Sequence, residues 1–282
     1  MNRKPTHEAR HRNSERKNNS ADSTSGPLPS TPRVGRLRYL NVAPFFLNNG
    51  PDVVLSVSPR RLGEEALEDR VDAGPFSLAD AWRLEADFEP LGGFGIAVRG
   101  PARSVLLFSK KPMNELGNSR IGITDQTATS VKLLTVLLEL REGVRADFRR
   151  GFSDEDEARL VIGDDALTPS PEIKAAFPRV FDLGREWYLW RERPFVFAKW
   201  MVRRSISDDR KAELVYRLDA SLRRFERDPD LTARLAAEGS LLSAVQIRNY
   251  LSTFVYRLGS GEREAEEQFR SMASGLFADR EF

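Results

Sequence analysis

Residues 103–141 read RSVLLFSKKPMNELGNSRIGITDQTATSVKLLTVLLELR, and the rest of the chain is organised around this segment. It predicts a buried strand over Ser104–Ser109, a second strand over Arg120–Thr124, a polar turn and then a helix. The apolar residues of that helix recur with helical spacing, at Val131, Leu134, Leu137, Leu138 and Leu140. A strand, a turn and a helix in succession are typical of α/β folds.

The turn before this helix carries three small hydroxyl residues, Thr127, Thr129 and Ser130. The first N–H groups of a helix lack intrahelical partners, and the helix dipole favours negative charge there. One alternative is that Thr127 or Thr129 merely caps the helix. Three hydroxyls behind a strand favour a carboxylate or phosphate site, because such sites recur at this place in α/β folds.

The composition excludes several kinds of active site. The chain has 282 residues, enough for two modest domains, and no cysteine that could form a disulfide, a thiol nucleophile or a thiolate metal site. Its two histidines, His7 and His11, lie in an N-terminal segment whose polar composition is typical of disorder. We therefore expect no histidine base, Ser-His-Asp triad or histidine-bound metal in the folded part.

The excess of basic residues is confined to the N-terminal segment. Residues 1–33 hold seven Lys/Arg and three acids, a net +4, so a total charge of +2 leaves −2 for the rest. That balance does not indicate nucleic-acid binding. There is no secretory signal and no apolar run near the ~18–20 residues of a membrane span. We expect a soluble, cytoplasmic protein with neither a nucleic-acid nor a membrane partner.

The order of strands and helices predicts an α/β fold with mainly parallel, doubly wound sheets. Two long apolar strands, Val105–Phe108 and Phe195–Trp200, bracket a block of about 90 residues, the size of a small domain. We interpret them as two hinge crossings of a two-lobed fold with a ligand cleft between the lobes. The predicted parts are a disordered basic tail (1–34), a discontinuous domain (35–104 plus 202–282) and an inserted domain (105–201).

Two local predictions concern the second half of the chain. A short acidic helix is expected over Ser153–Ala158. From Asp208 to the end, the chain is expected to form helices and no strands, with one helix over Ser243–Tyr256. The aromatic residues Trp187, Tyr188 and Trp190 could line the cleft, but packing of the hinge is the favoured interpretation.

Polar residues at strand ends form the candidate site, because a doubly wound sheet brings these ends to one side. Taken singly, Asn41 could be a turn residue, while Ser77 and Asp164 could be helix caps. Amides and hydroxyls bind and orient an anion well but are poor general bases, which indicates either a binding protein or an enzyme whose substrate supplies much of the reactivity. The candidates are Asn41, Ser77, Ser104, Thr127, Thr129, Ser130 and Asp164.

At these residues the chain resembles the chorismate dehydratases of the futalosine route to menaquinone. The resemblance runs in order from about Gly35 to Leu276, nearly the whole folded chain. The matching segments are Tyr39-Leu40-Asn41-Val42-Ala43-Pro44, Ser104–Lys110, Thr124-Asp125 with Ala128–Val131, Ile162-Gly163-Asp164 with Ala166-Leu167, Asp182-Leu183-Gly184 with Glu186-Trp187, and Pro194–Ala198.

The resemblance implies a type II periplasmic-binding-protein fold and a hydro-lyase that removes water from chorismate to give 3-[(1-carboxyvinyl)oxy]benzoate. It implies no cofactor or metal, and chorismate as the small-molecule partner of a monomer or homodimer. By motif, Asn41 and Ser77 would lie nearest the chemistry, and Thr127, Thr129 and Ser130 would hold a substrate carboxylate. One departure is Leu78, where the family often has a second hydroxyl residue.

Two alternatives stay open at this point. One is a non-enzymatic carboxylate-binding protein of the same fold. The other is the sibling enzyme of the pathway, 1,4-dihydroxy-6-naphthoate synthase, whose opening motif differs from Tyr39-Leu40-Asn41 and which is thought to use a histidine base. The expected lack of histidine in the folded part counts against the sibling enzyme.

Overall fold

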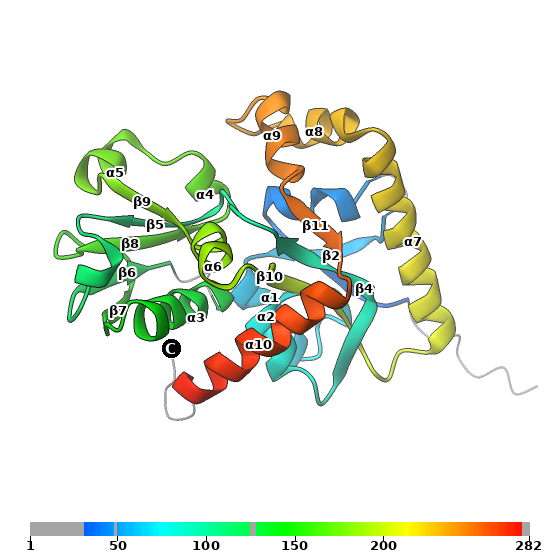
Figure 1. Cartoon of the computed structure of the whole chain (residues 1–282). Helices are drawn as coiled ribbons and strands as arrows, with labels where there is room; N and C mark the ends of the chain where they lie inside the picture. Colours follow the sequence, from blue (N-terminus) through cyan, green and yellow to red (C-terminus); the bar gives the residue numbers. More distant parts are fainter. Residues whose placement is uncertain (1–30, 48–49, 125–127, 278–282) are drawn as a thin grey trace, which may run out of the picture. The chain divides into compact units, whose positions relative to one another are not determined.

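The computed structural model describes residues 31–47, 50–124 and 128–277, which form two lobes, each built on its own β-sheet (Figure 1). The first sheet has the strand order β11 (Phe254–Arg257), β4 (Phe88–Val98), β10 (Phe195–Arg203), β3 (Ala73–Ser77), β1 (Val34–Leu37) and β2 (Val53–Val57). The second has the order β7 (Asp147–Arg150), β6 (Arg120–Ile123), β8 (Ala158–Ile162), β5 (Val105–Ser109) and β9 (Arg179–Asp182).

Helices connect and cover these strands, as the two-lobed α/β prediction requires. None of the helices in the described ranges is long and apolar enough to cross a membrane. The α-helices are α1 (Pro59–Leu67), α2 (Leu78–Arg83), α3 (Thr129–Val136), α4 (Asp164–Leu167), α5 (Pro171–Ala176), α6 (Leu183–Arg191), α7 (Asp208–Arg227), α8 (Pro229–Ala237), α9 (Ala244–Leu251) and α10 (Ser260–Phe277). The described ranges also hold two 3₁₀ helices, η1 (Leu40–Phe45) and η2 (Met113–Glu115), and one π-helical segment, η3 (Leu137–Arg141).

Residues 103–141 fold as predicted into the strands β5 and β6 and the helix α3. The helix continues through η3, and four of its predicted periodic residues, Val131, Leu134, Leu137 and Leu138, are at most 2% exposed. The fifth, Leu140, is 45% exposed, so its place on the buried face was predicted wrongly. Of the predicted turn over Asp125–Ser130, residues 125–127 lie outside the described residues, and Thr129 and Ser130 already belong to α3. Burial of one apolar face is what holds such a helix against its sheet.

Both sheets are mixed, so the prediction of mainly parallel sheets was wrong. Strand β1 pairs in parallel with β2 and β3, and β6 with β7 and β8. The antiparallel pairs are β10 with β3 and β4, β11 with β4, and β5 with β8 and β9. For the pair β4 and β10 the reason lies in the crossings, because β4 leads out of the six-stranded lobe and β10 leads back into it alongside. Neighbours that leave and return must run in opposite directions.

Two helix predictions were wrong over part or all of their length. The helix expected to run to residue 256 ends at Leu251 as α9, and residues 254–257 form strand β11. Its side chains alternate between buried (Phe254, Tyr256) and less buried positions, the period of a strand. At 153–157 the chain turns instead of forming a helix. There the fully buried Asp156 accepts hydrogen bonds from Arg120 Nε (3.0 Å) and from the main-chain N–H of Ser153 (2.8 Å).

The crossings between the lobes are fixed by side chains at α6. Asp182 caps this helix at Arg185 N, and it also accepts hydrogen bonds from the main-chain N–H groups of Ala102 (2.9 Å) and Arg103 (2.6 Å). Trp187 is fully buried and packs edge-on against Phe195 with ring centroids 5.5 Å apart. The favoured interpretation of this aromatic group as hinge packing is therefore confirmed for Trp187. The predicted domain boundaries at residues 34, 104 and 201 stay a prediction.

Candidate active site

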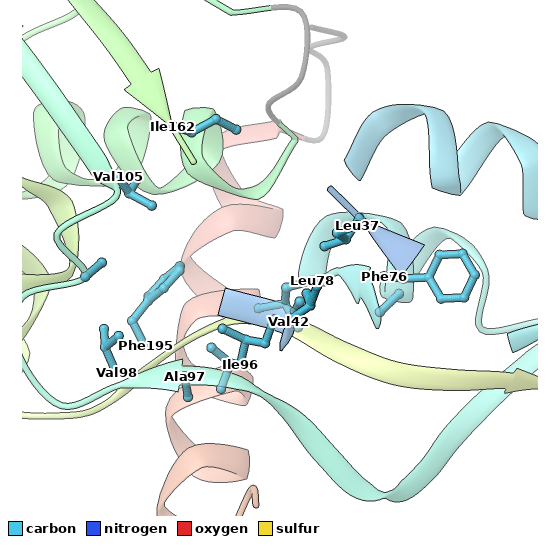
Figure 2. Close-up of a cluster of buried hydrophobic side chains, with 14 of the residues drawn as sticks. Leu37, Val42, Phe76, Leu78, Ile96, Ala97, Val98, Val105, Ile162 and Phe195 are labelled. Carbon is cyan, nitrogen blue, oxygen red and sulfur yellow. The ribbon is translucent and has the colours of Figure 1, made fainter. Parts of the chain in front are cut away.

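A cavity lies between residues of the two sheets, with an empty volume of about 560 Å³ that includes solvent at its mouth. Figure 2 shows four of its apolar residues, Leu37 and Ile96 from the six-stranded lobe and Val105 and Ile162 from the five-stranded lobe. The full lining is Leu37, Tyr39, Asn41, Pro59, Ser77, Ile96, Ser104, Val105, Ala128, Thr129, Ser130, Ile162, Gly163, Phe197, Ala198 and Phe254.

Asn41 reaches the cavity from η1, shortly after β1. The helix η1 is anchored to α7 by the buried Ser221, whose hydroxyl accepts from Leu47 N–H (2.9 Å) and donates to the Pro44 carbonyl (2.8 Å). The side-chain oxygen of Asn41 is buried and accepts no hydrogen bond from any described residue. A buried carbonyl oxygen without a donor is costly, so Asn41 is well placed to accept a hydrogen bond from a bound molecule.

Ser77 lies at the end of β3 and caps α2, so the capping interpretation is correct, but its side chain also lines the cavity. Its hydroxyl oxygen accepts the main-chain N–H of Asp80 (3.2 Å), and its hydrogen is donated to Asp80 Oδ2 (2.7 Å). Leu78, the departure from the family pattern, is fully buried and is not part of the cavity wall. Ser77 thus caps α2 and also lines the cavity.

Thr129 and Ser130 line the cavity from the first turn of α3, whereas Thr127 lies outside the described residues. The Thr129 hydroxyl does not cap its own helix. Instead it accepts a hydrogen bond from the main-chain N–H of Ala79 (3.0 Å), in the first turn of α2 on the other lobe. Capping therefore does not explain Thr129, and the first turn of α3 faces the cavity with its hydroxyls in place.

Ser104 lies at the crossing into β5 and also lines the cavity. Its hydroxyl accepts from the fully buried phenol of Tyr250 on α9 (2.7 Å) and donates to the carbonyl of Ala102 (3.4 Å). Burial raises the pKa of Tyr250 far above the usual value for a phenol, so this side chain stays neutral and continues to donate. The contact holds α9 against the hinge.

Asp164 is not part of the cavity wall, although its neighbour Gly163 is. The Asp164 carboxylate accepts a hydrogen bond from the main-chain N–H of Leu40 (3.2 Å). Burial raises the pKa of this carboxyl group, the Leu40 hydrogen bond lowers it, and the nearby Asp165 raises it further. The structure thus gives Asp164 a contact to the motif that carries Asn41.

Tyr39 is a wall residue that the prediction did not include among its site residues. Its ring lies so close to Gly163 that a Cβ there would be 2.3 Å from Tyr39 Cε1, and Gly163 has φ +70°, where glycine is favoured. Tyr39, Gly163 and Phe197 all fall in the motif segments quoted above, which was the signal available for them. Phe254 carried no such signal, because its segment was predicted to be helical.

The cavity wall carries no charged side chain among the described residues. Its polar groups are one amide, the phenol of Tyr39 and hydroxyls, set among apolar side chains. An anion in this cavity would therefore be held by hydroxyl and main-chain N–H groups at the start of α3 rather than by an ion pair.

Comparisons with known proteins decide the family. Residues 32–275 match the model of a family described as menaquinone biosynthesis. The chain belongs to this family. It is also 31% identical over 268 residues to the chorismate dehydratase of Thermus thermophilus, an alignment that covers 87% of this chain and 96% of that relative. The family resemblance inferred from the sequence motifs is thereby confirmed.

Solved structures agree on the fold. Protein AF1704 from Archaeoglobus fulgidus superposes with a TM-score of 0.70 at 17% identity, covering 87% of this chain and 97% of that one. The periplasmic aliphatic sulphonate binding protein SsuA from Escherichia coli superposes with a TM-score of 0.57 at 12% identity, over 90% and 95% of the two chains. At these identities the likeness concerns the fold alone, and it confirms the predicted periplasmic-binding-protein-like architecture.

Proposed function

We propose that the protein is a chorismate dehydratase, a hydro-lyase that converts chorismate into 3-[(1-carboxyvinyl)oxy]benzoate and water for menaquinone biosynthesis. The observation that carries the proposal is the neutral cavity between the lobes. Asn41 and Ser77 lie in the wall from one lobe, and Thr129 and Ser130 from the other. Membership of the menaquinone biosynthesis family and the similarity to the Thermus thermophilus enzyme support it.

In this proposal, the first turn of α3 holds a substrate carboxylate. Chorismate carries two carboxylates, and Thr129 and Ser130 lie in the wall at the start of α3, where the first N–H groups of a helix lack intrahelical partners. Thr127 belongs to the same proposed anion site. Ser104, in the wall at the hinge, is proposed to contact the substrate from the start of β5.

Asn41 and Ser77 are the residues proposed to act on the reacting ring. The reaction breaks one ring C–H bond and the adjacent C–OH bond, forms a C=C bond and releases water, and the product ring is aromatic. Asn41 hydrogen-bonds the reacting region, and Ser77 binds the departing hydroxyl group. The proton from carbon goes to the enolpyruvyl carboxylate of the substrate, because the described part of the wall offers no histidine, lysine or carboxylate that could accept it.

Asp164 is proposed to act indirectly, through its hydrogen bond to Leu40. The sequence placed it among the substrate-binding residues, and we propose that it contributes by holding Leu40, and with it Asn41, when the lobes are closed. We also propose a basic tail over residues 1–34, domains divided near residues 104 and 201, a cytoplasmic location, and a monomer or homodimer.

Product analysis tests the proposal. Purified protein is incubated with chorismate, and the mixture is separated and weighed by mass spectrometry. The expected result is a product lighter than chorismate by one water, formed in proportion to enzyme concentration. A protein that is stabilised against heat by chorismate but returns it unchanged would instead be a carboxylate-binding module of the same fold.

A further inference from the structure

A buried carboxylate stands directly behind the cavity wall at Ser77. Asp80 is 6% exposed and Ser77 is 5% exposed, and 2.7 Å separates the Ser77 hydroxyl oxygen from Asp80 Oδ2. Asp80 itself is not part of the wall, so it can reach a bound molecule only through the serine. The pair therefore forms a two-member chain from the cavity into the six-stranded lobe.

Helix capping does not require this contact. An N-cap serine needs only to accept the N–H of the third helical residue, which Ser77 does at Asp80 N (3.2 Å). In a capping box, an acidic side chain at that position would accept the main-chain N–H of the capping residue. Asp80 accepts the serine hydroxyl instead. The carboxylate thus controls where the hydroxyl hydrogen of Ser77 points.

The protonation state of Asp80 decides what Ser77 offers to the cavity. When Asp80 is ionised, the Ser77 hydrogen points to the carboxylate and the cavity meets only an oxygen lone pair. When Asp80 carries a proton, that proton can be shared with the serine oxygen, and the Ser77 hydrogen is free to be donated into the cavity. Only the second state can deliver a proton to a departing hydroxyl group.

The surroundings of Asp80 make protonation easier than it is for an exposed aspartate. Burial raises the pKa of its carboxyl group, against the lowering effects of the Ser77 hydrogen bond and of the Arg83 guanidinium, which contacts Oδ1 at 2.9 Å. Across from it on α1, Glu64 raises this pKa and Arg60 lowers it. Room for the carboxyl group is made by Gly63, where a Cβ would lie 2.6 Å from Asp80 Oδ1.

We propose that Asp80 is a positioning residue that passes a proton through Ser77 to the hydroxyl group leaving the substrate, an inference that rests on the proposed dehydratase function. As the C–O bond breaks, the Ser77 hydrogen moves to the departing oxygen to complete water, and the Asp80 proton moves to Ser77. The proton that the substrate carboxylate took from carbon returns to Asp80 through solvent when the products leave. No proton is gained or lost in the cycle.

The test compares Asp80→Asn with Asp208→Asn in the full chain. Both are acids in the first turn of a helix, but Asp208 is fully exposed. In Asp80→Asn, the amide oxygen of the new side chain can still accept the Ser77 hydroxyl, so the fold and substrate binding should be kept while the exchangeable acid proton is lost. We expect kcat to fall by about 10²-fold or more with little change in KM. In the wild type, ionisation of Asp80 should lower kcat as pH rises, and this decline should be absent from Asp80→Asn.

A second comparison shows whether Asp80 acts through Ser77. In a Ser77→Ala background, adding Asp80→Asn should cost little further activity, because the two residues form one chain. An Asp80→Asn enzyme with normal kcat and an unchanged pH profile would overturn the proposal and leave the dehydratase function standing. A wild-type protein that does not convert chorismate would overturn the dehydratase function, and the Asp80 proposal with it.

Discussion

The main-chain N–H of Leu40 donates a hydrogen bond to the carboxylate of Asp164 (3.2 Å), although the two residues are 124 positions apart. Leu40 begins the 3₁₀ helix that carries Asn41, and Asp164 begins α4 on the other lobe. The hydrogen bond from Ala79 N–H to the Thr129 hydroxyl (3.0 Å) has the same form. In both, a main-chain donor of the six-stranded lobe meets a side-chain acceptor of the five-stranded lobe beside the cavity.

These contacts predict that Asp164 supports closure of the lobes. Asp164→Ala removes the acceptor for Leu40, and a hydrogen bond of this kind is worth about 0.5–1.5 kcal/mol. We expect KM for chorismate to rise by about two- to tenfold, while Asp164→Asn, which keeps an oxygen acceptor, should change it less. Steady-state kinetics give the answer. Asp165→Ala is the control, because Asp165 is exposed, and an unchanged KM in Asp164→Ala would contradict the closure role.

The same residue predicts a pH dependence of stability. Burial raises the pKa of Asp164 above its ordinary value of 3.8. A carboxyl group with a raised pKa in the folded state contributes stability below its unfolded pKa, and loses that contribution as pH rises through the folded value. The stability of wild type relative to Asp164→Asn should therefore fall between about pH 4 and neutrality. Urea unfolding of both proteins across this range measures it, and a relative stability that rises with pH would show the opposite sign.

The close approach of Gly163 to Tyr39 gives a packing prediction. Gly163→Ala introduces a side chain at φ +70° and a Cβ 2.3 Å from the Tyr39 ring. Gly143→Ala is a matched control, since Gly143 has φ +72° and open space around its Cβ position. The control should lose about 1–2 kcal/mol from the backbone alone. Gly163→Ala should lose more, and it should also lose activity because Tyr39 is displaced from the cavity wall. If Gly163→Ala and Gly143→Ala lose the same free energy of unfolding, the Tyr39 ring moves aside without cost and the packing prediction is wrong.

Sequence patterns were enough to predict the elements that have strong local signals. The strands and helix of residues 104–141 follow from apolar periodicity, and the crossings follow from two unusually apolar strands. Strand direction could not be predicted in this way, because periodicity is the same for parallel and antiparallel neighbours. The return of β10 beside β4 is a property of the whole topology.

Motifs in the sequence were enough to predict several residues of the cavity wall, but not the contacts that these residues make. Asn41 and Ser130, two of the residues named from the motifs, line the cavity, and their roles toward a substrate stay a prediction. Ser77 shows why capping and a place in the cavity are not exclusive alternatives, because this residue caps α2 and also lines the cavity. The partners that span the lobes, Asp164 with Leu40 and Thr129 with Ala79, carry no local signal, since each pair is formed only by the tertiary fold.

The most direct test of the central claim is the turnover of chorismate by wild type and by Asn41→Ala, with Asn249→Ala on the exposed face of α9 as control. Loss of a hydrogen bond made in the transition state costs about 3–4 kcal/mol. We therefore predict that Asn41→Ala lowers kcat by about 10²-fold or more with a smaller change in KM, and that Asn249→Ala behaves as wild type. Near-normal turnover by Asn41→Ala, or a wild-type protein that leaves chorismate untouched, would contradict the account.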